Sequence, residues 1–211
     1  ILATSTTEMT SKQLAEKAGC STVPIKGLLK KGLLESRTVR TIMASDNQSS
    51  EKIPRQAPLE LNGEQQTAMK VINQALEANQ TQGILVHGVT GSGKTEVYLQ
   101  LIQQVINNGK QVLILLPEIT LTPQLAERFR KRLATQMVVS HSGLNDSQRS
   151  QAWLRIKKGL ANILLGTRSA VFTPMNAPGM IIMDEEHDPS FKQQEGFRYS
   201  ARNVAIMRAR D

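Results

Sequence analysis

The sequence predicts an α/β fold, a parallel β-sheet with helices on both faces, preceded by a small helical domain. Two observations predict it. Between residues 59 and 211, apolar runs of strand length alternate with segments of helical spacing, the pattern of strands joined by crossover helices. The polar stretch at 45–58 has hardly any apolar residue and cannot join a packed core. We therefore expect a domain at 1–44, a linker at 45–58 and an α/β domain at 59–211.

The domain at 1–44 reads as two short helices around a tight turn, followed by a strand-like segment. Thr10 and Gln13 have the spacing of a capping box, and Gly19 is placed to end the first helix. The residues at 33–42 place apolar side chains among Arg and Thr, as a wing strand does. This order resembles a winged helix-turn-helix.

Two lysines make this domain a candidate for DNA binding. Lys26 and Lys30 lie on the second predicted helix, where a nucleic-acid reader presents contacts to phosphates. The alternative is a helical module that docks another protein and keeps these lysines on a solvated face. Because residue 1 is Ile rather than Met, we expect a piece of a longer protein, with this domain truncated at its start.

The charge balance favours a polyanionic partner. Lys and Arg number 26 against 18 Asp and Glu, giving a formal charge of +8 and a pI near 9.8. The single Cys20 excludes an internal disulfide framework and a cysteine-rich zinc site within this chain. No run reaches membrane-spanning length and no leader opens the sequence. We therefore expect a cytoplasmic protein without a membrane partner.

The domain at 59–211 is predicted to place its ligand site at the carboxyl ends of parallel strands. Its helices begin at residues typical of caps, and its strands are short apolar runs. The caps are Asn62 with Gln65, Thr122 with Pro123, and Asn145 with Gln148. The predicted strands are 84–86, 111–117, 137–140, 162–166 and 180–183.

A glycine-rich stretch at 88–95, here called the phosphate loop, fits the nucleotide-binding pattern G-x-x-x-x-G-K-[ST]. Its glycines let backbone N–H groups surround a polyphosphate, and the helix that follows adds a positive dipole end. Lys94 is expected to reach the β and γ phosphates of ATP, and the Thr95 hydroxyl to hold Mg²⁺. The alternative is a glycine-rich turn with a solvated lysine. The loop consists of Gly88, Val89, Thr90, Gly91, Ser92, Gly93, Lys94 and Thr95.

Acidic residues follow the last predicted strand, at the sheet edge where the phosphate loop also opens. Asp184 occupies the position of a carboxylate that holds Mg²⁺, and Glu185 is the candidate to orient or activate the attacking water. A solvated acidic loop is the alternative for this short motif alone. Combined with a complete phosphate loop, the motif indicates a nucleotide hydrolase.

The phosphate loop and the sequence Asp-Glu-Glu-His at 184–187 resemble the DEAH-like subgroup of superfamily 2 helicases. Further matches at 88–98, 116–124, 141–143 and 166–170 are similar to the primosomal protein N′ family of replication-restart helicases. The resemblance covers 59–211 densely, and it implies a RecA-like P-loop NTPase fold, the first motor lobe of a helicase. It also implies a DNA helicase that moves 3′ to 5′ with ATP and Mg²⁺, recognises stalled forks and prepares primosome assembly.

The same resemblance assigns roles to further residues. It implies that Gln65 contacts the adenine, that His187 couples the nucleotide to DNA, and that loop residues meet the backbone of a single strand. These loop residues are Thr120, Thr122, Thr167 and Arg168. Helix capping is the alternative for Gln65 and Thr122, and loop hydrogen bonding for the others.

An aromatic stretch follows the acidic motif. The chain has four Phe, two Tyr and one Trp, yet Phe191, Phe197 and Tyr199 fall close together beside Lys192 and Arg198. Aromatic faces beside cations suit the stacking of unpaired bases, and the resemblance implies an aromatic-rich loop here that couples DNA binding to ATP hydrolysis. We therefore expect Phe191, Phe197, Arg198 and Tyr199 to bind DNA. The alternative is that the two Phe side chains pack under the sheet.

The resemblance also sets expectations for what lies beyond this chain. A second motor lobe with arginine fingers and a zinc-binding insertion are expected elsewhere, so this chain alone should bind Mg-ATP but hydrolyse it poorly. Expected partners are single-stranded and forked DNA, primosome proteins and single-strand-binding proteins. Two other readings stay open: a DNA- or partner-binding module with a non-catalytic nucleotide loop, and another superfamily 2 motor such as a branch-migration helicase.

Overall fold

The computed structural model describes residues 9–36, 56–78 and 81–210, which fall into two compact units, 1–41 and 42–211. The first unit contains helices α1 (Ser11–Ala18) and α2 (Thr22–Lys30). Thr10 and Gln13 form the predicted capping box, and Gly19 ends α1 in the left-handed conformation at φ 62°. Residues 37–42 of the wing predicted at 33–42 lie outside the described residues, so the winged-helix assignment stays a prediction.

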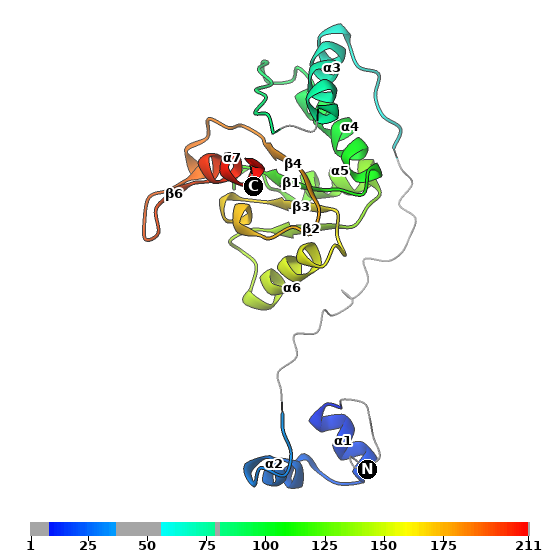
Figure 1. Ribbon diagram of the computed structural model, residues 1–211, viewed down its shortest axis with the longest axis vertical. Helices are drawn as coiled ribbons and strands as arrows, with labels where there is room; N and C mark the ends of the chain where they lie inside the picture. The colour runs from blue at the N-terminus through cyan, green and yellow to red at the C-terminus, as the bar shows by residue number, and fades with distance from the viewer. Residues whose placement is uncertain (1–8, 37–55, 79–80, 211) are drawn as a thin grey trace. The chain divides into compact units, whose positions relative to one another are not determined.

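The second unit is built on a four-stranded parallel sheet in the order β2-β3-β1-β4 (Figure 1). Helices connect successive strands and cover both faces, which confirms the predicted fold class. The strands are β1 (Gln111–Leu115), β2 (Met137–Ser140), β3 (Ile163–Gly166) and β4 (Pro178–Met183). The helices are α3 (Gly63–Glu77), α4 (Lys94–Asn107), α5 (Pro123–Leu133), α6 (Asp146–Lys157) and α7 (Ala201–Arg210).

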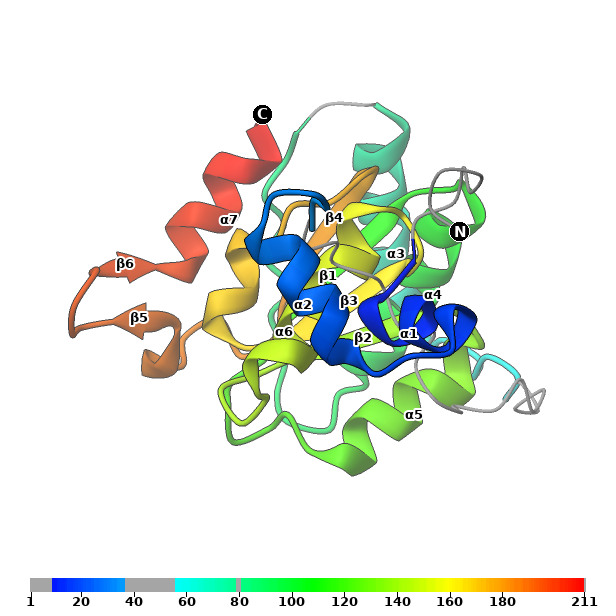
Figure 2. The same cartoon turned by 90° about the horizontal axis from the view of Figure 1, so that it is seen from below.

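Short elements complete this unit between β3 and α7. Two 3-10 turns, η2 (Arg168–Phe172) and η3 (Pro189–Phe191), follow β3 and β4. An antiparallel hairpin, formed by β5 (Lys192–Gln193) and β6 (Tyr199–Ser200), then leads into α7. The hairpin projects from the body of this unit in both views (Figure 2).

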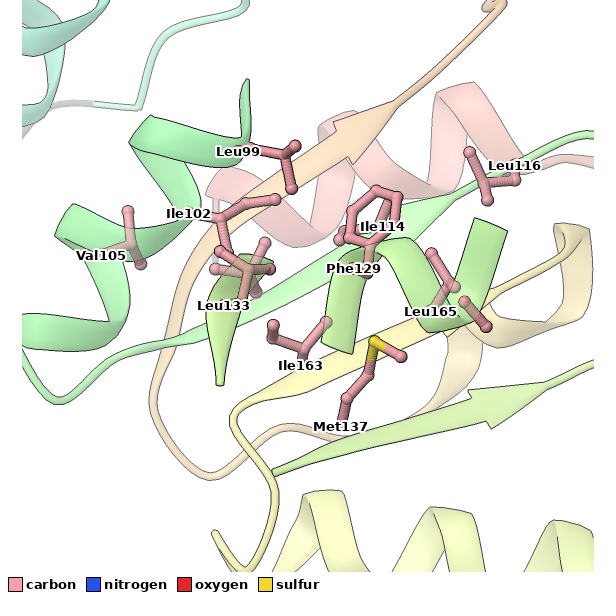
Figure 3. Close-up of a cluster of buried hydrophobic side chains, with 12 residues drawn as sticks. Leu99, Ile102, Val105, Ile114, Leu116, Phe129, Leu133, Met137, Ile163 and Leu165 are labelled. Carbon is pink, nitrogen blue, oxygen red and sulfur yellow. The ribbon is translucent and has the colours of Figure 1, made fainter. Parts of the chain in front are cut away.

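Strand β1 is buried at every position because both faces of the sheet are covered. Val112 and Ile114 pack with α4 and α5 in one apolar cluster (Figure 3). Leu113 and Leu115 point to the opposite face and pack with α6, η2 and α7. Side chains alternate along a strand, so a continuous apolar run serves two cores at once, as the sequence predicted for residues 111–117.

The helix caps predicted in this unit are present. Asn62 with Gln65 and Asn145 with Gln148 form capping boxes, and the Thr122 hydroxyl accepts the N–H of Leu125 ahead of Pro123. These side chains satisfy N–H groups that lack partners in the first turn of a helix. None of the described helices combines the length and the apolar character that crossing a bilayer requires.

The prediction of a strand at 84–86 is wrong. These residues form no strand, and Ile84, Leu85 and Val86 are 40%, 78% and 36% exposed. Among the described residues β4 pairs only with β1, and no strand pairs with 84–86. An apolar run indicates a tendency toward burial, but a strand also needs a partner edge in register, and local sequence does not encode that partner.

A buried ion pair joins α4 to α5. The Arg132 guanidinium lies 2.5 Å from Oε1 of Glu96, and the two side chains are 8% and 7% exposed. The same oxygen accepts hydrogen bonds from the Leu59 N–H at 3.1 Å and the Gln100 amide at 2.9 Å. Burial by itself raises the pKa of Glu96, but the hydrogen bonds from Arg132, Gln100 and Leu59 outweigh it and hold that pKa below its ordinary value.

We predict that Arg132→Ala lowers the free energy of unfolding by about 3–5 kcal/mol, because it leaves the Glu96 charge buried without a counter-charge. Urea denaturation at pH 7 measures this loss. The control is Arg130→Ala, which breaks a half-exposed pair with Glu127 and should cost about 0–1 kcal/mol.

The pH dependence of that loss has a definite sign. Because the folded pKa of Glu96 is depressed, its stabilisation is present above the unfolded pKa and is lost as pH falls through the folded pKa. The deficit of Arg132→Ala should therefore shrink in acid. Equal losses in the two arginine variants at pH 7 would contradict the assignment.

Candidate functional site

The phosphate loop adopts a conformation that glycine permits. Gly91 and Gly93 have φ values of 82° and 81°, in the left-handed region, and Gly93 is the N-cap of α4. A Cβ atom added to Gly93 would lie 2.2 Å from the side-chain nitrogen of Gln65. The loop therefore requires glycine here for its backbone angle, and a side chain at this position would also displace the Gln65 amide.

Lys94 places its ammonium group inside the loop. Its Nζ donates to the carbonyl oxygens of Gly88 at 2.6 Å and Val89 at 3.0 Å. Lys94 is also the first residue of α4, so free backbone N–H groups and the positive dipole end lie beside the ammonium. This combination suits a phosphate group.

Gln65 connects α3 to the phosphate loop. Its Oε1 accepts the Asn62 N–H at 2.9 Å, and its Nε2 donates to the Ser92 carbonyl at 2.9 Å. The capping alternative is therefore confirmed. Since the same amide touches the loop, Gln65 lies next to the expected nucleotide site, and its contact with adenine stays a prediction.

Asp184 reaches the phosphate loop from the end of β4. Its backbone N–H donates to the Leu115 carbonyl at 3.0 Å, which extends the pairing of β4 with β1. Its Oδ2 lies 3.2 Å from the Tyr98 hydroxyl, and that hydroxyl lies 3.3 Å from Oγ1 of Thr95. Thr95 and Asp184, far apart in the sequence, therefore meet across one side chain.

The residues at this meeting point fit a magnesium ion. Mg²⁺ prefers oxygen ligands, keeps several waters and is commonly held by one or two protein groups together with substrate phosphates. Thr95 supplies a hydroxyl and Asp184 a carboxylate. Within the described ranges, no group of three or more His, Cys, Asp or Glu side chains could hold a metal ion unaided. Thr95 and Asp184 could supply two ligands of such an ion.

The rest of the acidic motif consists of two exposed residues and a half-buried glutamate. Glu185 is exposed, and its backbone adopts φ 50°, an angle that is uncommon for residues other than glycine and asparagine. Glu186 pairs with Arg202 of α7 at 2.5 Å. His187 is exposed, and the Asp188 carboxylate accepts the Ser190 N–H at 2.7 Å. The roles of Glu185 and His187 in catalysis and coupling stay predictions.

Three threonines expected to meet DNA have structural partners or are buried. The Thr120 hydroxyl donates to the Pro117 carbonyl at 2.9 Å, and Thr122 caps α5. The capping alternative is therefore confirmed for Thr122. Thr167 is 7% exposed, with its N–H bonded to the Ser140 carbonyl. Thr167 is therefore buried beside β2, and its contact with DNA stays a prediction.

Arg168 links the turn after β3 to the aromatic hairpin. Its guanidinium donates to the Ser190 carbonyl at 2.9 Å and the Lys192 carbonyl at 2.8 Å. These bonds hold the chain between the acidic motif and β5. Arg168 therefore orders the hairpin, and its predicted contact with phosphates stays a prediction.

The aromatic stretch divides into a core residue and exposed residues. Phe191 is 2% exposed and packs in the core of the sheet face covered by α6 and α7. The packing alternative holds for Phe191, and its predicted stacking on bases is wrong because its ring is enclosed. Phe197 is 78% exposed, and its ring lies 6.0 Å from that of Tyr199 between ring centres.

Two aromatic residues near these sites were not predicted as site residues from the sequence. Phe172, 49% exposed, meets Tyr199 edge to face with ring centres 4.8 Å apart. Tyr98 bridges Thr95 and Asp184 as described above. Tyr98 was part of the motif at 88–98, but helical spacing gives no sign that its hydroxyl reaches β4. Phe172 follows the motif at 166–170, and only the tertiary fold brings it to the hairpin.

The structure does not test the DNA contacts that were predicted for the first unit. Lys26 and Lys30 are exposed on α2. Exposure agrees with either a phosphate contact or a solvated face, so DNA binding by this unit stays a prediction.

Comparison with known proteins identifies the family. Residues 64–209 match the DEAD/DEAH box helicase family. The chain belongs to this family. The match includes the phosphate loop and the acidic motif, whose convergence at Tyr98 is described above.

Several relatives carry the name replication restart protein PriA. The Bacillus subtilis protein is 42% identical over 93% of this chain and 24% of its own length. The Haemophilus influenzae protein is 54% identical over 59% of this chain and 17% of its own length, and the Synechocystis protein 43% identical over 96% and 24%. This chain therefore spans about a quarter of the length of such relatives, or less.

Among solved structures, the Sulfolobus solfataricus SWI2/SNF2 ATPase core in complex with dsDNA is similar over 74% of this chain and 30% of that chain. The sequence identity is 18% and the TM-score 0.49.

We predict that Phe191→Ala lowers the free energy of unfolding by about 3–5 kcal/mol, because a buried ring leaves a cavity. Phe197→Ala should change it by about 0.5 kcal/mol or less, since that ring is exposed. Thermal or urea unfolding of the two variants measures the difference. A similar loss in both would show that the hairpin ring is also part of the core.

Proposed function

We propose that this chain is the ATP-binding lobe, with an attached DNA-binding head, of a replication-restart DNA helicase. The observation that carries the proposal is the meeting of Thr95 and Asp184 at one hydroxyl, beside a phosphate loop that contains the Lys94 ammonium. The family match and the PriA relatives support the same function.

ATP is proposed to bind with its phosphates at the start of α4. Lys94 would exchange its bonds to the Gly88 and Val89 carbonyls for phosphate oxygens, and Thr95 and Asp184 would hold Mg²⁺, which neutralises phosphate charge. Glu185, which is exposed just beyond the end of β4, would orient the attacking water. His187 would couple the state of the bound nucleotide to DNA binding.

Single-stranded DNA is proposed to bind at the aromatic hairpin. A hollow of about 540 Å³ lies against β5 and β6, with Lys192, Arg198 and Tyr199 among its lining residues. Exposed Phe197 offers a ring for base stacking, and the cations offer contacts to phosphates. The Glu186–Arg202 pair joins the acidic motif to the start of α7, directly after the hairpin, and Arg168 joins η2 to the chain at the start of the hairpin. DNA occupancy could thus influence the nucleotide site.

The remaining functions rest on the relatives' names and on the resemblance of motifs. We propose 3′-to-5′ movement, recognition of stalled forks, and assembly with primosome and single-strand-binding proteins in the cytoplasm. Weak ATP turnover by this chain alone stays a prediction. A non-catalytic nucleotide loop in a binding module is the competing function.

We predict that Lys94→Ala weakens the binding of Mg-ATP by about tenfold or more, because charge-assisted hydrogen bonds to phosphate are lost. Equilibrium titration with a fluorescent ATP analogue measures it. Lys158→Ala, which removes an exposed lysine at the end of α6, should leave the affinity unchanged. Equal affinities of wild type and Lys94→Ala would support the binding-module function instead.

We further predict that Phe197→Ala and Tyr199→Ala weaken single-strand binding by about fivefold or more, corresponding to ~1–3 kcal/mol per stacked base. ATP affinity should not change. Fluorescence anisotropy with a labelled oligothymidine measures the DNA affinity. The control is Leu160→Ala, an exposed apolar residue ahead of β3, at the opposite end of the strands. Unchanged DNA affinity in both hairpin variants would remove the stacking assignment.

A further inference from the structure

Tyr98 lies at the interface of α4 and α5, one turn beyond the phosphate loop. Its ring stacks on that of Phe129 with centroids 6.1 Å apart and an angle of 18° between planes. Phe129 is fully buried in the cluster drawn in Figure 3. The Tyr98 ring is therefore held by packing, and its hydroxyl has little freedom to move away from its partners.

The hydroxyl of Tyr98 has two oxygen neighbours, Oδ2 of Asp184 at 3.2 Å and Oγ1 of Thr95 at 3.3 Å. A phenol carries one proton, and an ionised carboxylate only accepts. Tyr98 therefore donates to Asp184, and the Thr95 hydroxyl donates its own proton to the Tyr98 oxygen. This arrangement leaves lone pairs of Thr95 and Asp184 available to a cation.

The other oxygen of Asp184 is also oriented. Oδ1 accepts the Glu185 N–H at 3.1 Å, so each carboxylate oxygen has a donor that fixes its direction.

We propose that Tyr98 is a positioning residue that sets the Thr95 hydroxyl and the Asp184 carboxylate in place for a magnesium nucleotide. The inference rests on the proposed function of this site. A buried tyrosine that serves only the core needs one partner for its hydroxyl. The hydroxyl of Tyr98 instead joins the two residues proposed to hold the ion, and they come from different elements.

The position of Tyr98 also connects the site to α5. Phe129, which carries the ring stack, and Arg132, which pairs with Glu96, are three residues apart on one face of α5. Glu96 and Tyr98 are close together on α4. The two contacts fix α5 against the start of α4, and the N-cap of α5 is Thr122, which the resemblance of motifs assigns to the backbone of DNA.

The test is Tyr98→Phe in the full chain, which removes the hydroxyl and keeps the ring stack. A fluorescent ATP analogue is titrated at saturating Mg²⁺ and again in EDTA, and the melting temperature is recorded. We expect affinity at saturating Mg²⁺ to fall about three- to tenfold, because Thr95 and Asp184 lose the hydroxyl that orients them. Affinity in EDTA should not change, because the hydroxyl acts on the ion's ligands and not on the phosphates.

Two further variants sharpen the test. Thr67→Val removes a hydroxyl that donates to the Gly63 carbonyl within α3 and should leave both affinities as in wild type. In an Asp184→Ala background, Tyr98→Phe should have little additional effect, because the two changes then act on one unit.

The outcomes distinguish a positioning role of Tyr98 from a purely structural one. Equal losses with and without Mg²⁺, accompanied by a lower melting temperature, would show a purely structural tyrosine and overturn the inference, as would no loss at all. A wild-type chain that binds no nucleotide, or binds it as Lys94→Ala does, would instead overturn the proposed function. A loss confined to the Mg²⁺ condition supports Tyr98 as a positioning residue.

Discussion

The parallel pairing of β4 with β1 is the interaction on which the site depends. Met183 lies opposite Leu115, and the next residue, Asp184, donates its N–H to the Leu115 carbonyl. Helix α4 packs against the same central strand through Leu99, Ile102 and Val105. Strand β1 therefore fixes both sides of the site, the loop on α4 and the carboxylate after β4. A shift of one residue in this register would turn Asp184 toward the opposite face.

The phosphate loop and the start of α4 are held in place by contacts with α3 and α5. Gln65 holds the Ser92 carbonyl from α3, while Glu96 and Tyr98 meet Arg132 and Phe129 of α5. The Glu96–Arg132 pair is removed from water, where a missing partner costs more than the bond itself contributes. The nucleotide site is thus held by its neighbours as much as by its own glycines.

The acidic motif and the aromatic hairpin form a second connected region. Arg168 donates to carbonyls on both sides of Phe191, and Glu186 pairs with Arg202 at the start of α7. Phe172 and Tyr199 bring the turn after β3 against the hairpin. Buried Phe191 anchors this region in the core, and exposed Phe197 remains open to a ligand. One stretch of sequence therefore contains both a buried anchor and an exposed ring.

The sequence alone determined the local features of this protein. The phosphate loop, the capping boxes of Asn62 and Asn145 and the buried run of β1 follow from nearest neighbours and side-chain spacing. The tertiary structure decided which residues face solvent or one another. It left residues 84–86 unpaired, enclosed Thr167 and Phe191, and placed Tyr98 between Thr95 and Asp184. These outcomes depend on strand partners and helix packing between residues distant in sequence, which periodicity and propensity do not specify.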